Sequence, residues 1–145
     1  MFKHLLLPTD GSAASEAAIR QSILFAKETG ATVTGVHVIP EYHVFSRHLL
    51  TLTETKEQFD KEGIAQADKF LDAIKRAAQE AGVPCDTEYV VSDHPYEAIL
   101  KMAEDKGCDM ITMASHGRKG MRGILAGSET QKVLTHGKKP VLVFR

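Results

Sequence analysis

Five short apolar runs, separated by four stretches with helical periodicity, restrict what this chain can fold into more than any other feature of its sequence. The first run, Leu5-Leu6-Leu7, is wholly apolar, which is typical of a strand covered on both faces. The regular alternation predicts a parallel sheet with right-handed crossovers. We therefore predict an α/β fold, a doubly wound five-stranded parallel sheet with helices on both faces, in a single domain over residues 1–145. The other four runs are Thr32–Ile39, Thr87–Val91, Asp109–Met113 and Val141–Phe144.

The helix boundaries are marked by capping residues. Ser12 is a candidate N-cap of the first helix, and Gly30 and Gly82 stand where the first and second helices should end. Pro95 is placed to open the third helix. The run 87–91 alternates apolar and polar residues, which favours a position near a sheet edge. Residues 41–53 are too apolar for a bare loop, so we expect them to fold over another part of the molecule.

Composition excludes several classes of protein. A formal net charge of −1 argues against a general nucleic-acid binder, which would show a basic face. No apolar stretch is long enough for a membrane span, and the N-terminal one is too short for a signal peptide. Cys85 and Cys108 lack a CxxC partner, and we expect both to be reduced. These observations predict a cytoplasmic protein.

The fourth strand leads into a glycine-rich stretch from Ala114 to Ser128, which precedes the last helix. Such a connection can present several backbone N–H groups to one anion, and Ser128 could both cap the helix and face that anion. Arg118, Lys119 and Arg122 add positive charge. We interpret the stretch as a phosphate cradle. The alternative is a surface loop with solvated basic residues, although long structureless loops are uncommon in compact domains.

Ligands of doubly wound sheets bind beyond the carboxyl ends of the strands. The first strand ends at Pro8 and is followed by Thr9 and Asp10. Asp10 could hydrogen-bond a ribose or a base, or it could serve only as a turn residue, and the residues themselves leave both open. Val38, at the end of the second strand, could line an adenine or belong to the ordinary core.

The sequence contains none of the specific catalytic or nucleotide-binding motifs that we considered. The glycine-rich stretch does not fit a Walker A motif, and its glycines follow the fourth strand, whereas a dinucleotide fingerprint follows the first. Ser115 and His116 would point apart on an extended chain, which makes them a poor catalytic pair. His43 and His48 stand five residues apart, which is weak evidence for a metal site. We expect neither catalytic residues nor a metal site.

Several motifs together resemble the universal stress protein family over almost the whole chain. ATP-binding members of that family carry a glycine, two residues, a second glycine, nine residues, and then glycine with serine or threonine. Here Gly117 and Gly127-Ser128 match, whereas Ala114 stands at the first position. The motifs that carry the resemblance are Pro8-Thr9-Asp10-Gly11-Ser12, His37-Val38-Ile39, Ser115-His116-Gly117, Gly127-Ser128 and Lys139-Pro140-Val141-Leu142-Val143.

The resemblance implies a Rossmann-like fold of the adenine nucleotide alpha hydrolase type and an ATP site, with Mg²⁺ accompanying the nucleotide. By matching positions, Pro8, Thr9, Asp10 and Val38 would hold adenine and ribose, and Met113 would lie beneath the nucleotide. The phosphates would meet the 114–118 and 127–129 segments, that is Ala114, Gly117, Arg118, Gly127, Ser128 and the amide of Glu129.

The resemblance also implies a homodimeric, nucleotide-dependent regulator of the stress response. Val141–Phe144 is apolar and is the last strand of an open sheet, so pairing of two copies would protect its edge. Two alternatives stay open at this point. One is an interaction module of the same fold that binds no nucleotide, and the other is a slow ATPase.

Overall fold

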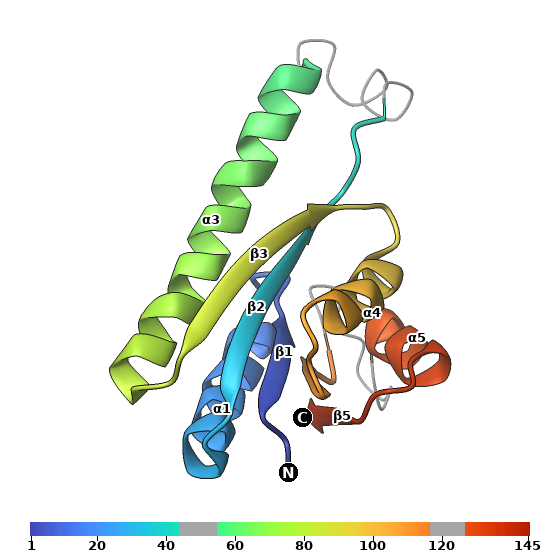
Figure 1. Cartoon of the computed structure of the whole chain (residues 1–145). Helices are drawn as coiled ribbons and strands as arrows, with labels where there is room; N and C mark the ends of the chain where they lie inside the picture. The colour runs from blue at the N-terminus through green and yellow to red at the C-terminus, as the bar shows by residue number, and fades with distance from the viewer. Residues whose placement is uncertain (44–54, 117–126) are drawn as a thin grey trace.

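The computed structural model describes residues 1–43, 55–116 and 127–145. In these ranges strands and helices alternate along the chain as the sequence predicts (Figure 1). The elements are β1 (His4–Pro8), α1 (Ala13–Thr29), β2 (Thr32–Ile39), α3 (Lys56–Ala81), β3 (Cys85–Val91), α4 (Pro95–Asp105), β4 (Met110–Ala114), α5 (Ser128–His136) and β5 (Val141–Phe144).

The described strands form one parallel five-stranded sheet in the order β3-β2-β1-β4-β5. This confirms the predicted doubly wound α/β fold, including the edge position of the strand with alternating residues, β3. Helices α1 and α3 cover one face of the sheet, and α4 and α5 cover the other (Figure 1). Strand β1 therefore lies at the centre of the molecule, with β2 on one side and β4 on the other.

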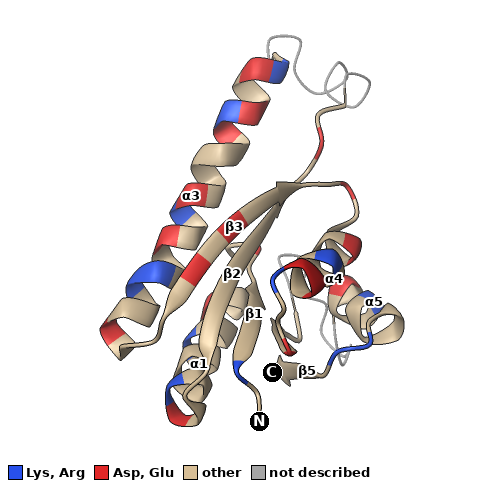
Figure 2. Cartoon of the chain, in the orientation of Figure 1, with Lys and Arg blue, Asp and Glu red and all other residues tan. Residues whose placement is uncertain are grey.

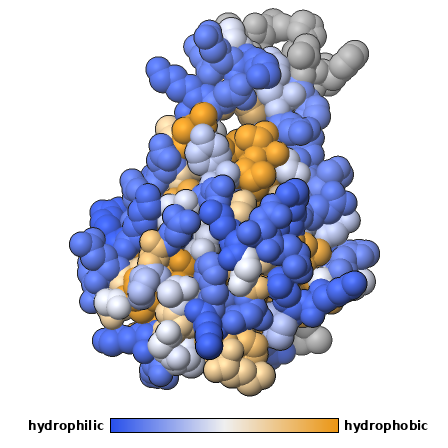
Figure 3. Space-filling model, viewed as in Figure 1, coloured by the Kyte–Doolittle hydropathy of each residue, from blue (hydrophilic) through white to orange (hydrophobic). Residues whose placement is uncertain are grey.

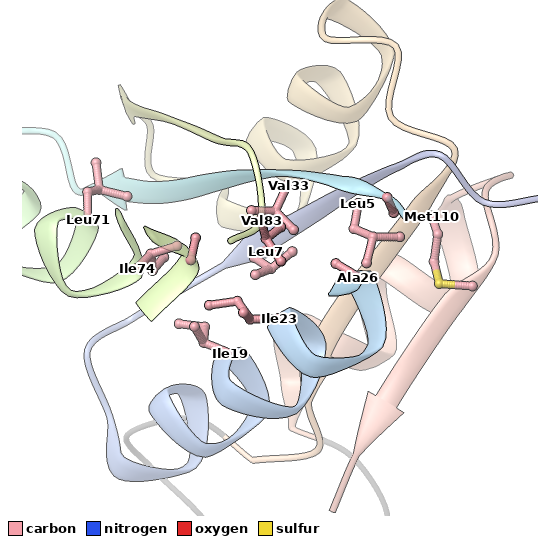
Figure 4. Packing of buried hydrophobic residues seen from close by; sticks show 12 residues of the cluster. Leu5, Leu7, Ile19, Ile23, Ala26, Val33, Leu71, Ile74, Val83 and Met110 are labelled. Atoms are coloured by element: carbon pink, nitrogen blue, oxygen red, sulfur yellow. The ribbon is translucent and has the colours of Figure 1, made fainter. Parts of the chain in front are cut away.

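Successive leucines of β1 supply both layers of the core. Leu5 and Leu7 pack with α1 and α3, as Figure 4 shows, whereas Leu6 packs with α4 and α5. All three have no exposed surface. Because complete burial of such a side chain stabilises a fold by about 1.5–3 kcal/mol, this short strand anchors both layers.

The predicted helix boundaries are confirmed at four positions. The Ser12 side chain accepts a hydrogen bond from the Ser15 backbone N–H at 3.1 Å and caps α1. Gly30 and Gly82 end α1 and α3 in the left-handed conformation, with φ of 71° and 73°. Pro95 occupies the first turn of α4. The capping residues therefore determine where these elements start and stop.

The distribution of charged and apolar residues on the surface follows from this arrangement of helices and sheet. Charged residues of both signs line the exposed side of α3, whereas β1 and β2 are almost free of them (Figure 2). An apolar patch is visible where β3 ends, and Val91 there is 52% exposed (Figure 3). Among the helices described, none is long and apolar enough to cross a bilayer.

Of the apolar segment 41–53, only the first three residues are described. Tyr42 packs its ring against Phe59 of α3, with ring centroids 5.4 Å apart. The rest of the segment, residues 44–53, lies outside the described residues. The expectation that the segment folds over another part of the molecule is therefore met by its first residues, and for residues 44–53 it stays a prediction.

Candidate functional site

The sheet changes its direction of winding between β1 and β4. These strands are neighbours, yet β1 leads to α1 on one face and β4 leads toward α5 on the other. At such a point the two connections diverge and leave a crevice at the carboxyl ends of the strands. Strand β1 ends at Pro8 and β4 ends at Ala114, so the turn after Pro8 and the residues around Ala114 lie at this edge.

The turn after β1 is fixed by its own polar side chains. The Thr9 hydroxyl accepts hydrogen bonds from the Gly11 backbone N–H and from the Ser15 hydroxyl, both at 3.1 Å. Asp10 accepts the Ser12 backbone N–H at 2.9 Å, which is the behaviour of an Asx turn. The turn-residue interpretation of Asp10 is thus confirmed, and its role toward a ligand stays a prediction.

The same turn is held from outside by an aromatic residue of α3. Gly11 has a φ of +76°, and a Cβ atom at this position would lie within 2.6 Å of three ring atoms of Phe70. The Phe70 and His37 rings also pack against each other in a T-shaped arrangement, with centroids 5.2 Å apart and an interplanar angle of 75°. Helix α3, strand β2 and the turn after β1 therefore pack together at this corner.

Strand β2 contributes two hydrogen bonds to Thr9. The Thr9 N–H donates to the Val36 carbonyl at 2.9 Å, and His37 Nδ1 lies 2.8 Å from the Thr9 carbonyl oxygen. The sequence places His37 in one of the family motifs and Phe70 in the core, but it predicts no role in the site for either residue. The available signal for the first was a histidine among the apolar residues at the end of its strand, next to Val36, Val38 and Ile39. No pattern distinguishes Phe70 from any other core position of its helix.

The apolar candidates Val38 and Met113 belong to the core layer on the α4 and α5 side. Met113 is 8% exposed, and Val38 is half-buried against the same cluster. The structure therefore places both on one side of the sheet, near the ends of β2 and β4. Their contact with a nucleotide stays a prediction.

The start of α5 differs from the prediction in one respect. Gly127, with φ −63° and ψ 161°, is the N-cap residue, and Ser128 is the first residue of the helix. Ser128 is therefore not the cap, and Gly127, which has no side chain, makes no side-chain capping hydrogen bond. Instead, the Thr130 hydroxyl reaches back to the Ala114 carbonyl at 2.9 Å and ties α5 to the end of β4.

Glu129 connects the first turns of two helices. Its Oε2 accepts the Tyr96 backbone N–H of α4 at 2.9 Å, and its Oε1 lies 3.2 Å from Lys132 Nζ. The Glu129 side chain therefore points toward α4. Its backbone N–H lies in the first turn of α5, where helix geometry leaves amide groups without an intrahelical acceptor.

The prediction that Ser115 and His116 point apart is wrong. Ser115 Oγ lies 2.8 Å from His116 Nδ1. The reason is that β4 ends at Ala114, so the chain is no longer extended at Ser115. Ser115 is 1% exposed, and its carbonyl accepts the Gly127 backbone N–H, which closes the connection between β4 and α5.

Two predicted phosphate-binding residues, Gly117 and Arg118, lie outside the described residues, as do Lys119 and Arg122. The described chain contains both ends of the glycine-rich stretch. The stretch begins at Ala114, the last residue of β4, and it reaches the N-cap of α5 at Gly127.

Within the described ranges, Glu41, His43 and Asp93 could hold a metal ion, because one ligand atom from each lies within 4.8 Å of the others. His43 Nε2 contacts Asp93 Oδ2, and the Glu41 backbone N–H donates to Asp93 Oδ1 at 2.9 Å. The hydrogen bond from His43, followed by that from Glu41, lowers the pKa of Asp93. The sequence does not indicate this cluster, because Asp93 follows a different strand, and the spacing of His43 and His48 was only weak evidence for a metal site. His48 lies outside the described residues.

The model of the universal stress protein family matches residues 1–145 of this chain. The chain belongs to the universal stress protein family. Universal stress protein MJ0577 of Methanocaldococcus jannaschii is 32% identical over 100% of this chain and 96% of its own length. Universal stress protein YxiE of Bacillus subtilis is 32% identical over the full length of both chains. A solved structure of MJ0577 superposes with a TM-score of 0.82 at 34% identity, covering 99% of this chain and 95% of that one.

More distant relatives of the same fold have been solved with adenine nucleotides. One is a universal stress protein in complex with cAMP, with a TM-score of 0.72 at 21% identity, covering 99% of this chain and 97% of that one. Another is the universal stress protein from Archaeoglobus fulgidus in complex with dAMP. It superposes with a TM-score of 0.70 at 19% identity, covering 100% of this chain and 98% of that one. Adenine nucleotides are therefore ligands of structural neighbours of this chain.

Proposed function

We propose that this universal stress protein binds ATP, accompanied by Mg²⁺, in the crevice at the carboxyl ends of β1 and β4. It acts there as a nucleotide-dependent regulator of the stress response, working as a cytoplasmic homodimer. The observation that carries the proposal concerns the ends of two neighbouring strands between which the sheet changes its winding: the fixed Thr9–Ser12 turn follows β1, and the Thr130–Ala114 hydrogen bond ties the first turn of α5 to the end of β4. The adenine nucleotides bound by structural neighbours support the choice of ligand.

The N-terminus of α5 fits a phosphate group. The first-turn amides of any α-helix lack intrahelical acceptors and carry a partial positive charge, so they favour an anion. Here Gly127 is the N-cap, and because glycine has no side chain its backbone can be approached closely. In the proposed complex the N–H groups of Ser128 and Glu129 donate to phosphate oxygens, together with Gly117 and Arg118.

The other side of the crevice fits the nucleoside. Asp10 stands on a turn held by backbone and side-chain hydrogen bonds, which keeps its carboxylate in place for a ribose hydroxyl. Pro8 and Thr9 with Val38 line the adenine, and Met113 lies beneath the nucleotide. Because the turn is already ordered, binding loses little conformational freedom there.

The test is the thermal stability of nucleotide-free protein with and without ATP and Mg²⁺. At about 100 times its dissociation constant, a ligand adds about 2.7 kcal/mol of stability, which raises the melting temperature by several degrees. Gly127→Val tests the phosphate contact specifically. Valine can adopt the φ of −63° and the ψ of 161° found at this position, but its side chain would cover the first-turn amides. We expect this variant to fold and to lose most of the ATP-dependent shift. Wild-type protein that shows no shift refutes the proposal.

The nucleotide content of freshly purified protein separates the two alternatives. Bound ATP supports the regulator, whereas bound ADP or AMP that accumulates from added ATP supports a slow ATPase. Protein that neither carries nor takes up nucleotide is an interaction module of this fold.

The homodimer rests on the edge strand β5. The Ile111 N–H bonds to the Pro140 carbonyl and the Ser115 N–H to the Phe144 carbonyl, so residues 140, 142 and 144 face β4. Alternate residues of a parallel strand bond to opposite sides, and the N–H and C=O groups of Val141 and Val143 therefore face the open edge. An unpaired apolar edge favours pairing with a second copy about a twofold axis.

Two proline variants test the dimer by light scattering. Val143→Pro removes only an outward-facing donor, so we expect a folded monomer. Leu142→Pro is the matched control, because it breaks the pairing of β5 with β4 and should destabilise the fold itself. A wild-type protein that is monomeric at micromolar concentration contradicts the proposal.

A further inference from the structure

The geometry points to His37 as a positioning residue of the nucleotide site, acting through the turn after β1 without touching the ligand; this inference rests on the proposed function. His37 stands near the end of β2 and is half-buried. Its Nδ1 atom lies 2.8 Å from the carbonyl oxygen of Thr9, the residue before Asp10. A carbonyl oxygen can only accept, so Nδ1 carries the hydrogen in this contact.

The hydrogen bond from His37 is the second of two that hold Thr9 on β2. The Thr9 N–H already donates to the Val36 carbonyl at 2.9 Å, which continues the pairing of β1 with β2 by one residue. Thr9 is 7% exposed, so its carbonyl oxygen has little access to water. Without the His37 donor this oxygen would lose its partner, and the peptide between Thr9 and Asp10 would be free to rotate toward another donor.

Phe70 fixes the ring that makes this bond. The Phe70 ring packs against the His37 ring in a T-shaped arrangement and fills the space beside Gly11. The two aromatic side chains therefore hold the turn from β2 and from α3, and the Asp10 backbone lies between the two held residues, Thr9 and Gly11. His37 controls where the Asp10 carboxylate stands relative to the α5 N-terminus.

Three variants separate this role from a general effect on stability. His37→Asn places a side-chain N–H close to the position of Nδ1 and retains the bond to Thr9. His37→Leu keeps the bulk and removes the donor. His4→Leu is the matched control, because His4 is also half-buried and hydrogen-bonded, with Nε2 2.7 Å from the Thr34 hydroxyl, but it stands at the opposite end of β1.

We expect His37→Leu to weaken ATP binding about five- to tenfold, since one hydrogen bond contributes about that much to an equilibrium. His37→Asn should bind within about twofold of wild type. His4→Leu should lower the melting temperature without changing the affinity. A His37→Leu variant that binds ATP as wild type does overturns the inference, and so does a folded His37→Asn variant that loses as much affinity as His37→Leu.

A nucleotide-free measurement keeps this inference separate from the proposed function. Nitrogen NMR of the His37 ring should show the hydrogen on Nδ1, and the backbone amide signals of Asp10 and Gly11 should shift in His37→Leu but not in His37→Asn. If wild type fails to bind ATP while these shifts appear, the ligand assignment is wrong and the control of the turn by His37 stands. Unchanged amide signals in His37→Leu overturn the positioning role whatever the protein binds.

Discussion

Replacing Gly11 with alanine tests how tightly the turn after β1 is held. Two costs add at this position. A left-handed backbone, here with φ +76°, costs an alanine about 1–2 kcal/mol. The new Cβ would also lie within 2.6 Å of three Phe70 ring atoms, and such overpacking costs about 1–3 kcal/mol. We therefore expect Gly11→Ala to lower the free energy of unfolding by about 2–5 kcal/mol.

Gly30 offers a matched control for the backbone cost alone. Its φ is +71°, and no described atom lies within 4 Å of the position that a Cβ would take. Gly30→Ala should therefore cost about 1–2 kcal/mol. The difference between the two variants measures the collision with Phe70. Combining Gly11→Ala with Phe70→Leu should recover part of that difference, after the separate effect of Phe70→Leu is subtracted.

Urea unfolding with linear extrapolation gives the required free energies. For a domain of this size, each kcal/mol also lowers the melting temperature by roughly 2–4 °C, so thermal unfolding provides an independent reading. Equal losses for Gly11→Ala and Gly30→Ala would refute the packing argument, because the backbone cost would then explain both.

Two further predictions concern thiol reactivity and acid stability. Burial raises the pKa of the Cys108 thiol to about 11, so a thiol reagent should modify the half-buried Cys85 first and Cys108 only on unfolding; a Cys85→Ser variant that still reacts rapidly would contradict this. Burial acts to raise the pKa of Asp109, but the N–H donors of Lys3 and His4 at 2.8 and 3.1 Å leave it below its ordinary value of 3.8. The Asp109 contribution to stability is therefore complete above pH 3.8 and is lost as pH falls through the lower folded pKa. Asp109→Asn should unfold with a shallower pH dependence in that range, and an unchanged slope would count against the assignment.

The fold was predictable because its signals are local and agree with one another. Wholly apolar runs such as Leu5–Leu7 require cover on both faces, and glycines at positions 30 and 82 end helices in the left-handed conformation that the structure contains. The alternation in β3 indicated an edge strand, and the structure agrees: β3 is the first strand of the sheet and none of its residues is fully buried. These properties depend on neighbouring residues along the chain, which a sequence displays directly.

Details of the site were harder to predict, because they depend on contacts between distant segments. Ser128 is a good N-cap residue, yet Gly127 takes that position while Thr130, one turn along, bonds to the Ala114 carbonyl of β4. Phe70 lies near Gly11 only because α3 and α1 cover the same face of the sheet. Residue type and spacing do not encode such contacts. A sequence pattern can therefore predict which strand ends form the site, but not which side chains hold those ends in place.

Ala114 shows how the structure changes the assessment of a departure from the family pattern. A glycine at this position would matter most if the backbone were left-handed there. Ala114 is instead the last residue of β4, and no non-glycine residue in the described ranges has a positive φ. Its carbonyl also accepts the Thr130 hydroxyl, a bond that alanine makes as well as glycine does. The departure therefore costs no backbone strain, and under the proposed function we expect its effect on nucleotide affinity to come from the added methyl group.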